Sequence, residues 1–333
     1  VNMSQSSNDV IPTAIKISAQ MDLTKKLFPA LDKLISVIEK KAKSLRGIIK
    51  TGRTHLMDAM PIDFAEELYA WSSQLKSSKK MLLTLEKKLL ELPQGGTAVG
   101  SGINAPKQFS RYFAQEMTKL LGNKIKCVKS ENFYHELSAQ DCSVQLSGEL
   151  KNLSVILMKI SNDLRWMNSG PLAGLSEIEL KALQPGSSIM PGKVNPVIPE
   201  AVAMASADVI GNDVTITVAA QSGNFQLNVM LPVIAYNLLK SINLLSGAMS
   251  ALSKNAISSF KVNNKNLEAS LSKNPILVTA LNTIIGYEKA AFIAKKAYKE
   301  NRPIIDVAAE ETDISKTKLS KLLDPSKLAK GGI

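Results

Sequence analysis

The chain has 333 residues, 45% of them hydrophobic and 5% aromatic, a composition that supports a sizeable buried core and excludes global disorder. No run approaches the roughly 18 uninterrupted apolar residues of a membrane span, and two cysteines with two histidines exclude a disulfide framework and a zinc-type cluster. The formal net charge of +12 comes from lysines dispersed along almost every segment, which predicts a solvated surface that attracts anionic substrates rather than a nucleic-acid-binding arm.

Hydrophobic residues recur at steps of three and four through most of the chain. Such stripes occupy residues 27–45, 64–89, 146–167 and 238–252, and Ser78 fills the one polar gap in the second of them. Sustained for roughly 20 to 30 residues, they predict long helices that pack at shallow angles in a bundle. No segment shows sustained period-two alternation bounded by hairpin turns, so the protein is predicted to be all-α.

Two domains are expected. A polar stretch at residues 254–266 separates the long stripes from shorter helical patterns, which predicts a central bundle domain over residues 1–260 and a small C-terminal helical domain over residues 261–333. The narrow stripes also suit helix association between subunits, so an oligomer is expected.

A loop at residues 186–200 combines hydroxyls, a lysine, an asparagine and a carboxylate with several glycines and prolines. Asn195 is predicted to be a helix N-cap with Pro196 at the first helical position, so the positive end of the next helix would face the loop. This pattern predicts a catalytic loop that binds a small anion. The alternative is a surface loop that only caps a helix.

Three further polar segments, at residues 4–9, 51–55 and 95–102, are expected at helix ends, where short hydroxyl and amide side chains often serve as caps. Residues 100–105, Gly-Ser-Gly-Ile-Asn-Ala, satisfy the three small-residue spacing of a dinucleotide-binding motif, but they follow a long helix rather than a strand, which excludes a nicotinamide site. His55 lies in a polar turn where an imidazole could exchange protons, whereas His135 has no such setting and is expected to be structural.

Taken together, the four segments resemble the signature regions of the fumarase/aspartase superfamily, and most closely class II fumarase. The Gly-Ser-Ser-Ile-Met-Pro-Gly-Lys-Val-Asn-Pro run is highly specific to the superfamily, and the resemblance covers essentially the whole chain. It implies reversible hydration of fumarate to L-malate without metal or cofactor, a place in the tricarboxylic acid cycle, and a homotetramer whose active sites each combine segments of three subunits. Cytoplasmic localisation is expected, or the mitochondrial matrix for a eukaryotic protein.

The resemblance also implies residue roles. Ser187 would remove a proton from the carbon next to a malate carboxylate. His55, paired with Glu200 across a subunit boundary, would activate the water in the hydration direction. These three are the expected catalytic residues. The implied substrate contacts are Ser6, Ser7, Asn8, Thr54, Lys193 and Asn195.

Two departures from the family pattern stand out. Met57 occupies a position that is commonly glutamine, and the family's N-terminal domain has no counterpart, which leads to the hypothesis of a truncated chain with an incomplete active site. An aspartate ammonia-lyase shares the serine loop and is the alternative enzyme. A non-catalytic, structural relative is the alternative from another class.

Overall fold

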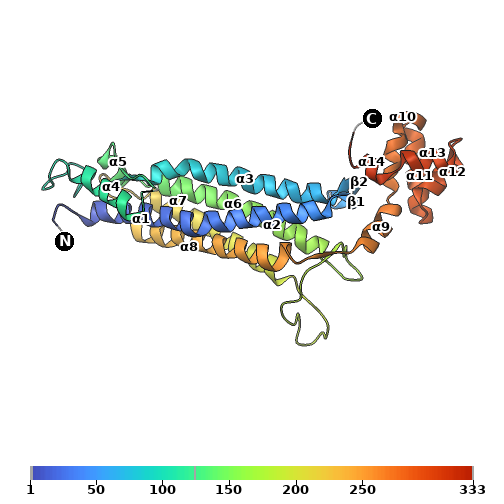
Figure 1. Cartoon of the computed structure of the whole chain (residues 1–333), viewed down its shortest axis with the longest axis horizontal. Helices are drawn as coiled ribbons and strands as arrows, with labels where there is room; N and C mark the ends of the chain where they lie inside the picture. Colours follow the sequence, from blue (N-terminus) through green and yellow to red (C-terminus); the bar gives the residue numbers. More distant parts are fainter. Residues whose placement is uncertain (1–2, 124, 332–333) are drawn as a thin grey trace. The chain divides into compact units, whose positions relative to one another are not determined.

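The computed structural model describes residues 3–123 and 125–331 of the chain (Figure 1). The described residues form two compact units. The first unit comprises the described residues within 1–36, 73–163 and 197–255. The second comprises those within 37–72, 164–196 and 256–333. The long helices are α1 (Ser7–Asp22), α2 (Phe28–Leu45), α3 (Phe64–Leu89), α6 (Asp141–Met167), α7 (Val197–Ala220) and α8 (Leu231–Leu252).

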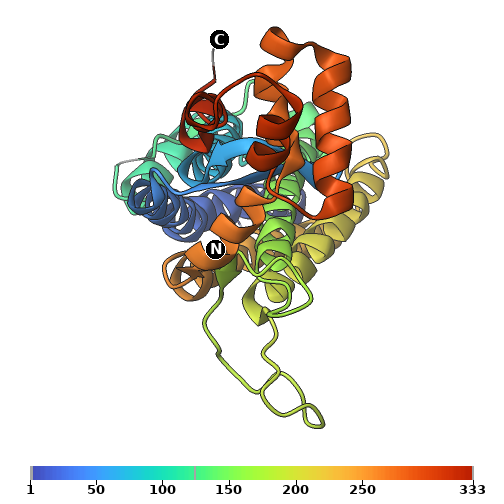
Figure 2. The same ribbon diagram turned by 90° about the vertical axis from the view of Figure 1, so that its right-hand side faces the viewer.

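The first unit is a bundle in which α1, α7, α8 and the adjoining stretches of α2, α3 and α6 lie side by side (Figures 1 and 2). The predicted stripes are the buried faces of their helices, because their residues in all four segments are buried and Ser78 is buried with them. The third stripe is the most regular, and its members Leu146, Leu150, Leu153, Leu157 and Ile160 are fully buried. The long-helix prediction is therefore confirmed. Shorter helices in this unit are α4 (Phe109–Leu120) and α5 (Phe133–Ser138).

The second unit contains a β-hairpin that the sequence pattern did not predict. Strand β1 (Ile49–Thr54) pairs antiparallel with β2 (Met57–Asp63), and the register shifts between Thr51 and Arg53. This bulge interrupts the alternation of side chains, and the two-residue turn contains no glycine or asparagine. Both signals that normally identify a hairpin are therefore missing from the sequence.

The other strands are only two residues long. Strand β3 (Glu91–Leu92) pairs parallel with β4 (Val128–Lys129), and β5 (Ile178–Glu179) pairs antiparallel with β6 (Lys261–Val262). Helix remains the dominant structure, so the all-α prediction is confirmed with these short pairs as additions.

The C-terminal part of the second unit consists of short helices around their own apolar cluster. The helices are α9 (Asn264–Ser272), α10 (Asn282–Ile285), α11 (Tyr287–Glu300), α12 (Ile304–Glu311), α13 (Lys316–Leu322) and α14 (Pro325–Leu328), with a 3₁₀ helix at Pro275–Leu281. Leu281, Ile293 and Val307 are completely buried in the cluster, and Ile49 of the hairpin packs against it. The hairpin base thus rests on the C-terminal helices. The division at residue 260 stays a prediction.

Helix α7 is long and apolar enough, by length and composition, to cross a membrane, with a mean hydropathy of 1.2 over 18 residues. The helix contains no uninterrupted apolar run of about 18 residues, because polar residues divide it. Asp213 is buried, and its carboxylate accepts hydrogen bonds from Ser147 Oγ at 2.8 Å and Lys151 Nζ at 2.5 Å. These partners on α6 give α7 the polar contacts of a helix packed against protein.

Candidate active site

The segment at residues 4–9 builds the N-terminus of α1. Ser6 is the N-cap, its Oγ accepts from Asn8 N at 3.2 Å, and Asp9 Oδ1 accepts from Ser6 N at 3.0 Å, which completes a capping box. Ser7 is the first helical residue and is exposed. The expected capping role is present, and the dipole of α1 gives this end a positive potential suited to an anion.

Asp9 also joins this helix end to the glycine-rich segment. Its Oδ2 accepts from Gly95 N and Thr97 N, both at 2.9 Å, and the Asn8 amide donates to Ala98 O at 2.8 Å. Asp9 is fully buried. The structure therefore brings together two of the four predicted segments, and Asp9, a residue that sequence reasoning passed over, holds them. Its position three residues after Ser6 is a capping-box signal that could have found it.

The segment at residues 51–55 lies on the hairpin rather than at a helix end, which corrects the prediction. Thr54 is the last residue of β1, and His55 with Leu56 forms the turn before β2. His55 has φ 54° and Leu56 has φ 61°. Two consecutive residues with positive φ form the kind of turn that matches the twist of paired strands. Thr54 and His55 are both exposed, so the hairpin presents a hydroxyl and an imidazole at its tip.

The loop that carries Ser187 is closed at its neck by three hydrogen bonds. Gly186 N donates to Lys193 O at 2.9 Å, Asn195 Nδ2 donates to Gly186 O at 2.9 Å, and Lys193 N donates to Met190 O at 3.2 Å. A Cβ on Gly186 would lie 2.4 Å from Lys193 O, so only glycine fits. The segment between β5 and α7 otherwise follows an irregular course (Figure 2).

Asn195 is not the N-cap that the sequence suggested. Helix α7 begins at Val197, and the amide of Asn195 is used instead as a donor that closes the loop neck. Because α7 begins at Val197, Pro196 directly precedes the helix and is not its first residue, which the sequence pattern predicts it to be. Glu200 lies in the first turn of α7, where the helix dipole favours a carboxylate.

Within the loop, the Ser187 hydroxyl is the acceptor of two backbone N–H groups. Ile189 N lies 3.2 Å and Met190 N lies 3.1 Å from Ser187 Oγ. Two donors aimed at one oxygen stabilise negative charge on that oxygen. Lys193 is exposed and lines a cavity of about 630 Å³ together with Asn168, Lys261 and Asn263, which supply one further cation and two amides.

The nine predicted site residues divide between the two units. Thr54, His55, Ser187, Lys193 and Asn195 belong to the second unit, and Ser6, Ser7, Asn8 and Glu200 belong to the first. Among the residues that the structure describes, no group of three or more His, Cys, Asp and Glu side chains could hold a metal ion.

Comparison with known proteins identifies the family. A family model described as Lyase matches residues 1–211, and one described as Fumarase C C-terminus matches residues 277–330. The chain is 56% identical to a class II fumarate hydratase of Pseudomonas aeruginosa over all 333 residues, which is 72% of that relative's length. The chain belongs to the class II fumarate hydratase family. A Bacillus subtilis member is 43% identical over 99% of this chain and 71% of its own length.

Solved structures support the same fold. A class II fumarase from Schistosoma mansoni has a TM-score of 0.95 and 34% identity over 98% of this chain and 71% of that chain. A fumarate lyase from Brucella melitensis has a TM-score of 0.93 and 39% identity over 98% of this chain and 70% of that chain. Membership of the class II fumarate hydratase family confirms the resemblance that the four segments suggested, whereas the residue roles stay predictions.

Proposed function

We propose that the chain catalyses the reversible hydration of fumarate to L-malate, with Ser187 as the base that acts on malate. The supporting observation is the pair of backbone N–H groups on Ser187 Oγ. A serine hydroxyl is a poor base in water, and donors fixed on its oxygen stabilise the alkoxide that must form. The class II fumarate hydratase relatives support this reaction over other lyase reactions.

In the dehydration direction, Ser187 takes a proton from the carbon next to one carboxylate of malate. The electron pair left behind spreads into that carboxylate and gives a dianionic aci-carboxylate. Lys193 supplies a positive charge for this intermediate, and its ammonium lies on the same loop as the base. Such preorganised charges act most strongly where charge develops during the reaction.

Departure of hydroxide requires a second proton path on the opposite face of the substrate. His55 with Glu200 of another subunit protonates the leaving hydroxide, and in the hydration direction the same pair activates water. The exposed position of His55 at the hairpin tip supports this role, because an exposed imidazole can complete a site with residues from another chain.

The substrate carboxylates bind at two places. Ser6, Ser7 and Asn8 contribute hydroxyl and amide groups at the positive N-terminus of α1, and Thr54, Lys193 and Asn195 supply the remaining contacts. Because Asn195 also closes the loop neck, substrate contact and loop shape are linked at this residue.

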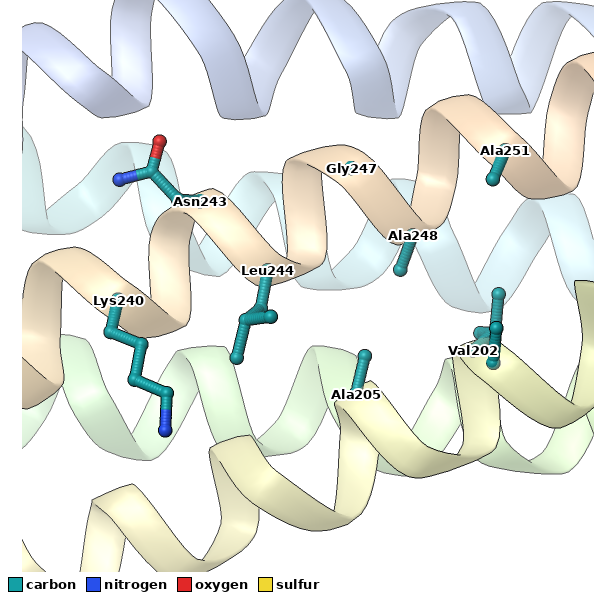
Figure 3. A pocket seen from close by; sticks show the side chains of 9 residues that line it. Val202, Ala205, Lys240, Asn243, Leu244, Gly247, Ala248 and Ala251 are labelled. Atoms are coloured by element: carbon teal, nitrogen blue, oxygen red, sulfur yellow. The ribbon is translucent and has the colours of Figure 1, made fainter.

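The composite site requires a homotetramer, and the exposed surface of α7 and α8 suits that assembly. A groove of about 460 Å³ runs between these helices and is lined mainly by small apolar residues (Figure 3). Lys240 and Leu244 project into it from α8, and Ala205 faces them from α7. Small residues let a further helix approach closely. We place the enzyme in the tricarboxylic acid cycle and in the cytoplasm.

The decisive test is the Ser187→Ala variant, with Ser188→Ala as a matched control in the same loop. Fumarate formation from malate is followed by absorbance, using protein expressed from its whole reading frame. Loss of the base is expected to reduce turnover by about 10² to 10³ or more, whereas Ser188→Ala retains most activity. Full turnover in Ser187→Ala would refute the assigned base. Ammonia release from aspartate without malate dehydration would instead assign the chain to the aspartate ammonia-lyases.

A further inference from the structure

A buried ion network lies beneath the hairpin that carries His55. Lys50 and Glu177 have side chains only 3% exposed, and Lys50 Nζ lies 2.5 Å from Glu177 Oε2. The other carboxylate oxygen, Glu177 Oε1, accepts from Arg53 Nη1 at 2.5 Å. Lys50 also reaches Glu67 Oε2 at 2.9 Å and lies 4.7 Å from the centre of the Phe64 ring. One carboxylate thus holds two cations of the same strand.

The bulge in β1 makes this arrangement possible. In a regular strand, residues three apart point to opposite faces, so Lys50 and Arg53 could not both reach one carboxylate. The register shift between Thr51 and Arg53 changes that alternation. Gly52 lies within the shift, and a Cβ there would be 2.6 Å from Met60 O. The sequence Lys-Thr-Gly-Arg therefore encodes a strand with two cations directed to one partner.

Glu177 is itself fixed by its backbone. Its N–H donates to Met167 O at 2.8 Å at the end of α6, and its carbonyl accepts from Asn263 N at 2.9 Å beside β6. It precedes β5 directly and lies ten residues before Ser187. Glu177 consequently connects the hairpin base to the segment that leads into the Ser187 loop.

The tip of the hairpin needs such an anchor. His55 and Leu56 both adopt positive φ, which side-chain-bearing residues avoid, and both are exposed. Strained backbone persists where the surrounding structure fixes it. At the tip itself little packing is available, so the constraint must come from the base, where Arg53 lies two residues before His55.

We propose that Glu177 is a positioning residue: through Arg53 and Lys50 it fixes the position of the His55 imidazole for the hydration reaction. This proposal rests on the proposed function of His55. Glu177 does not touch the substrate. A carboxylate with both oxygens bound to cations of one strand restricts rotation of that strand, and the two-residue turn transmits the restriction to the imidazole.

The test is the Glu177→Gln variant, which keeps the size of the side chain and removes its charge. Displacement of a catalytic group by about 1 Å can cost about 10²-fold in turnover, and we expect a loss of kcat of that order with little change in KM. In a His55→Gln background the same substitution should change kcat little, because no imidazole remains to be positioned. Equal losses in both backgrounds would overturn the proposal.

A matched control separates positioning from general destabilisation. Asp213→Asn neutralises a buried carboxylate that also binds a lysine and a second donor, but in the bundle. It should lower thermal stability as Glu177→Gln does, and its effect on kcat should be the same with and without His55. Arg53→Lys keeps the charge, loses the fixed geometry of the guanidinium, and should produce a smaller version of the Glu177→Gln effect.

A second readout does not depend on activity. These 333 residues contain two histidines, and the ¹³C NMR signals of their Cε1 atoms are assigned with His55→Gln and His135→Gln variants. In Glu177→Gln the His55 signal should shift or broaden while the His135 signal stays unchanged. An unchanged His55 signal would overturn the proposal even if fumarate hydration is confirmed. A shifted signal supports it even if the reaction proves to be a different one.

Discussion

At the scale of single residues, Leu56 is a position where the native conformation opposes the residue type. Its side chain is 61% exposed and its φ is 61°, so it contributes little burial and carries the cost of a left-handed backbone. Asparagine tolerates this conformation better than leucine. Leu56→Asn should therefore raise the stability of the folded chain by up to about 1 kcal/mol, measured as a higher midpoint of thermal unfolding.

The control is Leu56→Ala, which removes the same exposed apolar surface but keeps a side chain disfavoured at positive φ. We expect no gain in the unfolding midpoint from this variant. If alanine and asparagine stabilise equally, the gain comes from removing exposed leucine and the backbone explanation is wrong.

The sequence predicts the chemical role of a residue only where the residues that it acts with are close to it along the chain. Ser187 and its loop are recognisable because the glycines, lysine and asparagine lie within nine residues. Glu177 is not recognisable, since its cations lie more than 120 residues earlier and no local spacing indicates a buried ion network. The sequence pattern predicts the wrong local role for Asn195, because its amide donates across the loop neck rather than capping the next helix.

At the scale of elements, Gly52 determines the shape of the hairpin. A Cβ would meet the Met60 carbonyl, a backbone atom of the paired strand that cannot move without breaking the ladder. Gly52→Ala should destabilise the hairpin by about 1–3 kcal/mol, as other overpacked sites do, and should disturb the placement of Lys50 and Arg53 on Glu177. Hydrogen exchange of the β1 and β2 amides measures the effect.

Gly148→Ala on α6 is the control, since nothing lies within 4 Å of a Cβ at that position. Exchange should accelerate in the hairpin of Gly52→Ala and nowhere in Gly148→Ala. Unchanged exchange at the hairpin would show that the strands adjust to the methyl group without loss of pairing.

A helix or strand is easier to predict from the sequence when its hydrophobic pattern is longer. Heptads from Leu146 to Met167 persist for six steps and identify a buried helix face without ambiguity. The hairpin has strands of six and seven residues, a bulge and an unusual turn, so neither alternation nor turn composition identifies it. The hairpin is defined by the pairing of β1 with β2 across the turn, and this pairing is a property of the fold rather than of the local sequence.

At the scale of the whole molecule, the proposed tetramer and the proposed composite active site should be lost together. Gly247 lies on the exposed side of α8 in the groove shown in Figure 3, and a Cβ there meets nothing within 4 Å, so the chain itself tolerates a substitution. A glutamate at this position would place a charge where a partner helix approaches closely in the proposed tetramer, which opposes association through desolvation. Gly247→Glu should therefore reduce the mass measured by light scattering below that of a tetramer and abolish most turnover, while helix content by circular dichroism stays unchanged.

Gly247→Ala provides the contrast at the same position, because a methyl group adds helix propensity of about 1 kcal/mol without a charge. It should keep both the tetramer mass and the turnover. A Gly247→Glu protein that sediments as a single chain yet retains full turnover would show that the site needs no second subunit. That result would contradict the proposed pairing of His55 with Glu200 of another chain. The group that protonates the leaving hydroxide would then have to belong to the same chain as Ser187.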